Sequence, residues 1–257
     1  MKLKFVGLTG ICLILFASTC LGQQASVDSL RAALKTSVDA NQAAFINLQL
    51  FSYLSNSKKD SALIHFNNAI KYREQMTDSV RGYMHVYYMQ LMLGANKYDS
   101  VNFHFNEAMH SKENLNSSLL SNAYINNGLA HYFKGEYSKA IESYIEAEKA
   151  INMDDKLSTL KPRILNNIGI VYIQMENWPM AQRYMEKSLA QCKEQNIVRG
   201  ISYTLGNLGI IYKNLGEVNN AIDAYEEAGE IFSGLSDTSA LARNHQNIAS
   251  LYEDQGD

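Results

Sequence analysis

Small and apolar residues recur along this chain at a nearly constant interval. One set of equivalent positions is spaced 39 to 41 residues apart and consists of Leu50, Met89, Gly128, Gly169, Gly209 and Ala249. A second set follows each of the first five members by twelve residues and consists of Ala62, Val101, Ala140, Ala181 and Ala221. Between the two sets lie turn residues, such as Gly135 in the third unit. The interval therefore predicts a repeated pair of helices joined by a short turn.

Each predicted second helix carries a large residue between two small ones. The large residue comes four positions after the second set, at Phe66, Phe105, Tyr144, Met185 and Tyr225. Another small residue follows three positions later, at Ala69, Ala108, Ala147, Ser188 and Ala228. Residues three and four positions apart share one face of an α-helix. The pattern is typical of two helices that approach closely at the small residues and diverge around the large one.

These residues together resemble the tetratricopeptide repeat, although the interval is longer than the roughly 34 residues of the standard unit. Repeats of the kinesin light chain type are similarly long. The usual proline is missing, and the usual tryptophan is replaced by Ile46, His85, Tyr124, Leu165, Leu205 and His245. The resemblance implies an all-α fold, a right-handed α-solenoid of about 5.5 repeats, over residues 43–257. Each unit of such an array packs only on its neighbours.

The first 22 residues follow a different pattern. Two lysines precede an apolar run from Phe5 to Phe16, and small residues follow up to Gly22. This order is typical of a secretory signal peptide, and the apolar run is short for a membrane span. We expect cleavage before Gln23 and export to the periplasm. A lipoprotein acylated at Cys20 is the alternative, although the three residues before Cys20 fit that signal poorly.

A capping helix is expected over residues 23–42, because Val27, Leu30 and Leu34 share one helical face. The start of this stretch resembles exported repeat regions of bacterial membrane-bound sensors. In those proteins a membrane helix follows, and then a histidine kinase or a helix-turn-helix regulator. The resemblance implies a second possibility for localisation, which is an inner-membrane anchor with the repeats in the periplasm.

The sixth unit is incomplete, since the sequence stops at Asp257 in the turn after its first helix. Two explanations stay open at this point. The sequence is the front part of a longer protein, or the last helix caps the array and pairs with another chain, which implies self-association.

Composition and charge argue against several functions. The net charge is −3, and the repeats hold no basic cluster, so we expect no nucleic-acid partner. The six histidines are expected on helix surfaces, because none has metal-ligand spacing. No phosphate-binding loop or catalytic constellation occurs. We therefore predict a non-catalytic protein with no cofactor and no metal. Cys192, the single cysteine outside the signal segment, is expected to be a packing residue.

One polar set of equivalent positions indicates a binding surface. It stands two residues before the first set in the last four units, at Asn126, Asn167, Asn207 and Asn247. In kinesin light chain and similar proteins, asparagines in this segment hold the backbone of an extended peptide, since an amide offers both a donor and an acceptor. The alternative is structural, with the amides bonded to neighbouring backbone and fixing how the repeats stack.

The same resemblance implies further groove residues, which are Tyr132, Arg163, Asn166, Ile170, Tyr203, Ile210, Lys213 and Arg243. The three cations among them favour an acidic peptide or a free C-terminus. The sequence thus predicts a periplasmic scaffold that binds a protein or peptide along a concave groove. The alternative function is the sensory region of a membrane-bound signal-transduction protein, with its histidine kinase or DNA-binding part beyond residue 257.

Overall fold

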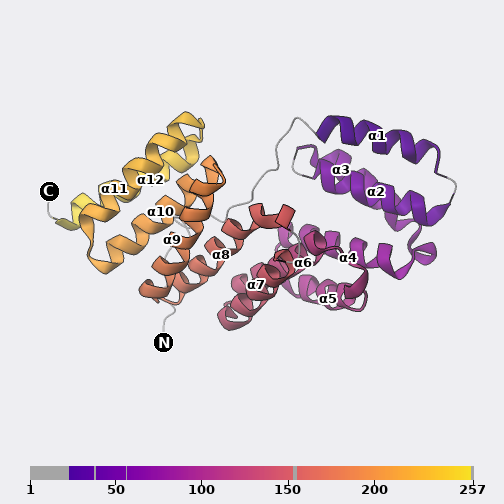
Figure 1. Cartoon of the computed structure of the whole chain (residues 1–257), viewed down its shortest axis with the longest axis horizontal. Helices are drawn as coiled ribbons and strands as arrows, with labels where there is room; N and C mark the ends of the chain where they lie inside the picture. Colours follow the sequence, from indigo (N-terminus) through magenta and orange to yellow (C-terminus); the bar gives the residue numbers. More distant parts are fainter. Residues whose placement is uncertain (1–22, 38, 56, 153–154, 256–257) are drawn as a thin grey trace. The chain divides into compact units, whose positions relative to one another are not determined.

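The computed structural model describes residues 23–37, 39–55, 57–152 and 155–255 (Figure 1). The expected signal segment, including Cys20, lies outside the described residues. Within the described ranges the chain is built of α-helices and short 3-10 helices, with no strand. By its internal contacts the chain separates into two compact units, with the boundary between residues 154 and 155.

The first unit contains a leading helix and three helix pairs. The leading helix α1 (Gln23–Lys35) packs on α2, and the pairs are α2 with α3, α4 with α5, and α6 with α7. The bounds of the paired helices are Ala40–Leu54, Lys59–Ile70, Asp78–Gly94, Tyr98–Met109, Ser117–Phe133 and Tyr137–Ile151. The 3-10 helices η1 (Arg73–Gln75) and η2 (Lys112–Asn114) connect successive pairs.

The second unit contains two helix pairs and a final helix. It begins with the 3-10 helix η3 (Asp155–Leu160). The pairs are α8 with α9 and α10 with α11, and α12 packs on α11 and α10. The bounds of these helices are Lys161–Gln174, Trp178–Glu194, Val198–Leu215, Val218–Gly234 and Thr238–Gln255.

The helices confirm the predicted all-α, tetratricopeptide-like array. Every member of the first set lies in the first helix of a pair or in α12, and every member of the second set lies in a second helix. The large residues of the second helices are buried at Phe66, Tyr144, Met185 and Tyr225, and Phe105 is partly buried. The interval read from the sequence is therefore the spacing at which one helix pair packs on the next.

Most of the turns within and between the pairs share one geometry. At the end of α6, the amide of Glu136 donates to the carbonyl of His131 at 2.9 Å, and Gly135 has a φ of 75°. The same pattern ends α10, where Glu217 donates to Tyr212 at 2.9 Å and Gly216 has a φ of 77°. This six-to-one bond with a left-handed residue is the Schellman motif, which satisfies carbonyls at a helix end.

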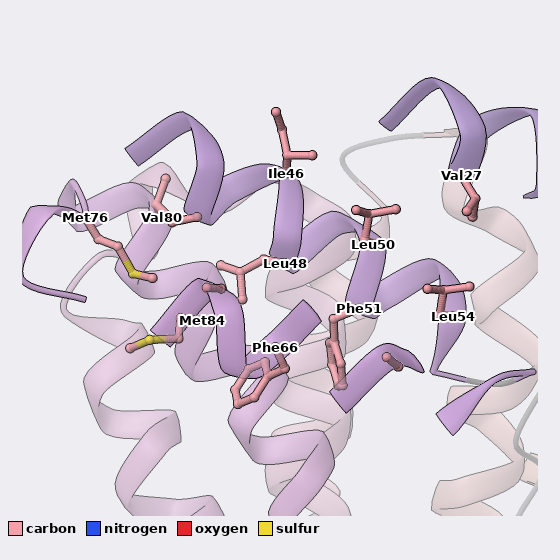
Figure 2. Close-up of a cluster of buried hydrophobic side chains, with 13 residues drawn as sticks. Val27, Ile46, Leu48, Leu50, Phe51, Leu54, Phe66, Met76, Val80 and Met84 are labelled. Carbon is pink, nitrogen blue, oxygen red and sulfur yellow. The ribbon is translucent and has the colours of Figure 1, made fainter. Parts of the chain in front are cut away.

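One apolar cluster of the first unit joins α1, α2, α3 and α4 (Figure 2). Phe51 of α2 and Phe66 of α3 lie with their ring centroids 5.0 Å apart, and Leu48, Leu50 and Met84 are buried in the same cluster. Val27 of α1 belongs to this cluster as well. The leading helix is thereby anchored on the first pair through its apolar face.

Cys192 of α9 is fully buried, as expected of a packing residue. Burial raises the pKa of its thiol to about 11, because the charged thiolate is poorly solvated there. A thiol with a raised pKa and no exposure is a poor nucleophile.

Candidate functional site

Four of the predicted groove residues line one small hollow in the second unit. Tyr203 and Asn207 of α10 meet Arg243 and Asn247 of α12 there. The remaining lining residues are Gly206, Phe232, Ala240 and Asn244. The residues come together because each predicted pair is spaced four positions apart and so occupies one face of its helix.

The start of α12 is fixed against α10 by polar contacts around one carboxylate. Asp237 caps α12, since its Oδ1 accepts from the amide of Ala240 at 3.1 Å. The hydroxyl of Tyr203 donates to Oδ2 of the same carboxylate at 3.0 Å, and a guanidinium nitrogen of Arg199 lies 3.6 Å from it. These contacts hold Tyr203 at the edge of the hollow.

Three of the asparagines form a buried group between α8 and α10. Asn166, Asn167 and Asn207 are each at most 3 % exposed. The Nδ2 of Asn207 donates to the Oδ1 of Asn166 at 3.2 Å, which links two successive first helices. Among the described residues, Asn166 Nδ2 and Asn167 Oδ1 have no hydrogen-bond partner. A buried amide atom without a partner costs about 1–3 kcal/mol.

Other predicted groove residues differ widely in exposure. Ile170 is 1 % exposed, so its side chain is not available for the apolar ligand contact expected from the sequence. Arg163 and Ile210 are half-buried, and Ile210 packs beside Tyr225. Lys213 is also half-buried, and its Nζ donates to Ser250 Oγ of α12 at 2.8 Å.

Asn126 and Tyr132 are the predicted groove residues of the first unit, and neither lines the hollow of the second unit. Asn126 is half-buried on α6, and the neighbouring Asn127 is buried and donates to Ser143 Oγ of α7 at 3.1 Å. Tyr132 is 7 % exposed. Burial raises the pKa of its hydroxyl to about 12, and Tyr137 adds to the effect. Tyr132 is therefore mainly a packing residue of the first unit.

Charge is unevenly divided between the first and second helices of the second unit. The first helices α8 and α10 contain four cations and no Asp or Glu, the cations being Lys161, Arg163, Arg199 and Lys213. Arg243 of α12 adds a fifth cation at the hollow. The second helix α11 is acidic instead, with Asp223, Glu226, Glu227 and Glu230. Of the helices that line the hollow, α10 is cationic and α11 is acidic, while α12 contributes Arg243.

Two of the six histidines, His110 and His245, are exposed as expected, and the other four are not. His65, His85, His104 and His131 are half-buried, and each makes a hydrogen bond with another side chain. Sequence reasoning missed this role. The signal was available, because His65 and His104 stand at equivalent positions next to a buried aromatic residue. In the described part of the chain, no group of three or more His, Cys, Asp or Glu residues is placed to hold a metal ion. Nor does any described helix have the length and apolarity needed to cross a membrane.

Two segments of the second unit match the tetratricopeptide repeat, at residues 163–194 and 202–231. The first spans most of α8 and α9, and the second spans most of α10 and α11. The matched segments therefore coincide with two helix pairs, of which the second contributes Tyr203, Asn207 and Phe232 to the hollow.

The chain is similar to one named transcriptional activator and to two solved Rap structures. It is 26 % identical over 124 residues to the transcriptional activator NprA of Geobacillus stearothermophilus, which is 48 % of this chain and 30 % of that protein. The structure of apo RapI has a TM-score of 0.67 at 18 % identity, over 91 % of this chain and 72 % of RapI. A Rap protein in complex with competence and sporulation factor has a TM-score of 0.70 at 11 % identity, covering 91 % and 66 %. At these identities the two structures show a shared fold.

Proposed function

We propose that this protein is a non-catalytic scaffold that binds an acidic, extended segment of a protein or peptide across α10 and α12. The observation that carries the proposal is the meeting of Tyr203, Asn207, Arg243 and Asn247 around one hollow. Tyr203 offers apolar area, Asn247 offers an amide to the ligand backbone, and Arg243 offers a fork of donors to a carboxylate.

The predicted residues fall into two roles in this proposal. The half-buried side chains of Arg163, Tyr203, Lys213, Arg243 and Asn247 are reachable from solvent and contact the ligand. The buried residues beneath them are Asn166, Asn167, Asn207 and Ile170. Their role is to hold the first helices in register, and the bond between Asn207 and Asn166 supports it.

The charge division supports acidic ligands over basic ones. A ligand lying across α10 and α12 meets Lys213 and Arg243, and α10 itself contains no Asp or Glu. The nearby carboxylate of Asp237 is already bonded to Tyr203 and lies beside Arg199. Complementary charge raises the rate of association and excludes partners of the wrong sign. Binding is therefore expected to weaken as salt screens the exposed charges.

Binding to labelled peptides tests this proposal. A pool of short peptides rich in Asp and Glu is expected to bind by fluorescence anisotropy, while a matched pool rich in Lys and Arg does not. The double variant Lys213→Ala, Arg243→Ala is expected to bind about tenfold more weakly, equivalent to about 1.4 kcal/mol. The control double variant Arg183→Ala, Lys187→Ala removes two exposed cations from α9. Equal loss in both double variants, or preference for the basic pool, would contradict the proposal.

A regulatory role for the whole protein is the second candidate. It is favoured by the similarity to a transcriptional activator and by the match covering only 30 % of that relative. Under this second proposal the repeats are the sensory region of the protein. The signal-peptide-like pattern of residues 1–22 would direct that region out of the cytoplasm.

The mass and location of the native protein distinguish these possibilities. We expect an exported species recognised by antibodies against the repeats. A mass near that of residues 23–257 in the periplasmic fraction supports a free scaffold. A much larger species in the membrane fraction supports a sensor. Detection in the cytoplasm with residues 1–22 retained would contradict export.

A further inference from the structure

Two histidines face each other across the second helix pair of the first unit. Nδ1 of His85 on α4 lies 2.9 Å from Nδ1 of His104 on α5. A neutral imidazole has one N–H and one lone pair, so one ring donates and the other accepts. One added proton leaves this bond intact, because a charged ring still donates to a neutral one. A second proton removes the acceptor and places two positive rings together.

Aromatic rings connect this pair to the preceding repeat. Tyr88 of α4 stacks on His104 with centroids 4.5 Å apart and planes at 4°. On its other side, Tyr88 meets Phe66 of α3 edge-on at 4.6 Å. The two histidines are therefore part of the packing that joins α3, α4 and α5.

The surrounding charges are few. Glu107 and His110 on α5 and Arg81 on α4 act on the pair, and Arg73 of η1 acts on Tyr88. The adjoining helices α2 and α6 contain no Asp, Glu, Lys or Arg, and α3 has Lys59 and Asp60 at its start. Glu107 is thus the one carboxylate in the described surroundings that favours a proton on the two rings.

The positions equivalent to His104 in the neighbouring repeats also bond to the first helix, but their partner there is an amide. In the first pair, His65 of α3 bonds to Asn47 of α2 at 2.9 Å. In the third pair, Asn127 of α6 bonds to Ser143 of α7 at 3.1 Å. His65, His104 and Ser143 each stand three residues after a member of the second set. Of these three bonds, the one in the second pair is formed by two groups that both titrate.

We propose that the His85–His104 pair is an acid-sensitive contact that releases α5 from α4 when both rings are protonated. Release separates the second helix pair and exposes the Tyr88 face that His104 covers. The second unit is not part of this event, so the chain loses order in one unit while the other stays folded.

The direction of the pH dependence follows from the pKa values of the pair. Burial, and then His104, lower the pKa of His85 to about 4, and burial lowers the pKa of His104. In an unfolded chain both pKa values lie near 6.5. Below that pH the folded state binds fewer protons than the unfolded state, so its stability falls as the pH drops from about 6.5 to about 4.

Two optical probes separate the units in the test. Trp178 is the only tryptophan and lies in α9 of the second unit, whereas far-ultraviolet circular dichroism reports both units. On acidification of the purified chain, we expect partial loss of helical signal before any change in Trp178 fluorescence. The variant His85→Asn keeps an amide–imidazole bond of the kind seen between Asn47 and His65. It is expected to move the midpoint of the helical loss down by about one pH unit.

A matched control uses His110, the C-cap residue of α5, whose side chain is 75 % exposed. Its effect on His85 is the smallest of the charges that act on the pair, so His110→Asn is expected to shift the midpoint much less than His85→Asn. If His85→Asn fails to fold, His104→Asn serves as the second variant with the same expectation. An unchanged midpoint in the pair variants, an equal shift in His110→Asn, or simultaneous change of both probes would overturn the proposal.

Discussion

Replacing Gly209 with alanine is expected to destabilise the second unit by about 2–4 kcal/mol, in the range of overpacked or strained core changes. A Cβ at Gly209 would overlap the ring of Tyr225, which is 1 % exposed on α11. The ring has no free space to move into, so α10 and α11 must separate. Denaturant unfolding followed by Trp178 fluorescence measures the loss.

Two other glycines serve as controls for the destabilisation expected in Gly209→Ala. Gly206 lies one turn earlier on α10, and a Cβ there meets nothing within 4 Å. Gly206→Ala is therefore expected to stabilise the unit by up to about 1 kcal/mol, because alanine favours helix. At Gly169 a Cβ would lie 2.8 Å from the end of Met185. Since methionine adapts its shape, Gly169→Ala is expected to cost less than Gly209→Ala. Equal costs at all three positions would show that close approach to Tyr225 does not matter.

The sequence predicts the fold well because the first and second helices meet at equivalent positions in every repeat, and in the third to fifth pairs through the same kind of contact. A glycine facing a large residue, as at Gly128 and Tyr144 or at Gly209 and Tyr225, is a local requirement that recurs at a fixed interval. Packing only on neighbours keeps that requirement identical along the chain. The helix pairs were therefore predicted from the interval of small and large residues.

The candidate site was predicted less completely, for a physical reason. Equivalent spacing shows that Asn167, Asn207 and Asn247 occupy one face of their helices, but it does not show what covers that face. In the structure Asn207 bonds to Asn166 of the preceding repeat, while Asn247 on α12 stays half-buried. The burial of Ile170 could not be predicted for the same reason, because it depends on how the neighbouring helix pair packs over it.

The histidine pair was missed because two different positions form it. His85 replaces the usual tryptophan of the first helix, whereas His104 stands beside the large residue of the second helix. Spacing along one helix cannot reveal a contact between helices. The bonds that His65 and Ser143 make at the position equivalent to His104 show that this position faces the first helix.

Phe66→Ala is expected to destabilise the first unit by about 3–5 kcal/mol, the usual cost of removing a buried phenylalanine. Phe66 is 2 % exposed and lies between Phe51 and Tyr88, with ring centroids 5.0 and 4.6 Å away. In this repeat the first-helix position opposite the large residue is Leu50, not glycine. The packing of α2 against α3 therefore depends on contacts between aromatic rings. Removing the Phe66 ring leaves a cavity, and the side chain of Leu50 prevents the two helices from moving together to close it.

The neighbouring Ile64 provides the control, because its side chain is 60 % exposed on the same helix. Ile64→Ala is expected to change stability by less than about 0.5 kcal/mol. Thermal unfolding followed by circular dichroism should show an early transition in Phe66→Ala, while Trp178 fluorescence keeps its original midpoint. A shift of the Trp178 midpoint by the same amount would mean that the two units unfold together. It would contradict this prediction, and also the proposal that acid disrupts the first unit while the second stays folded.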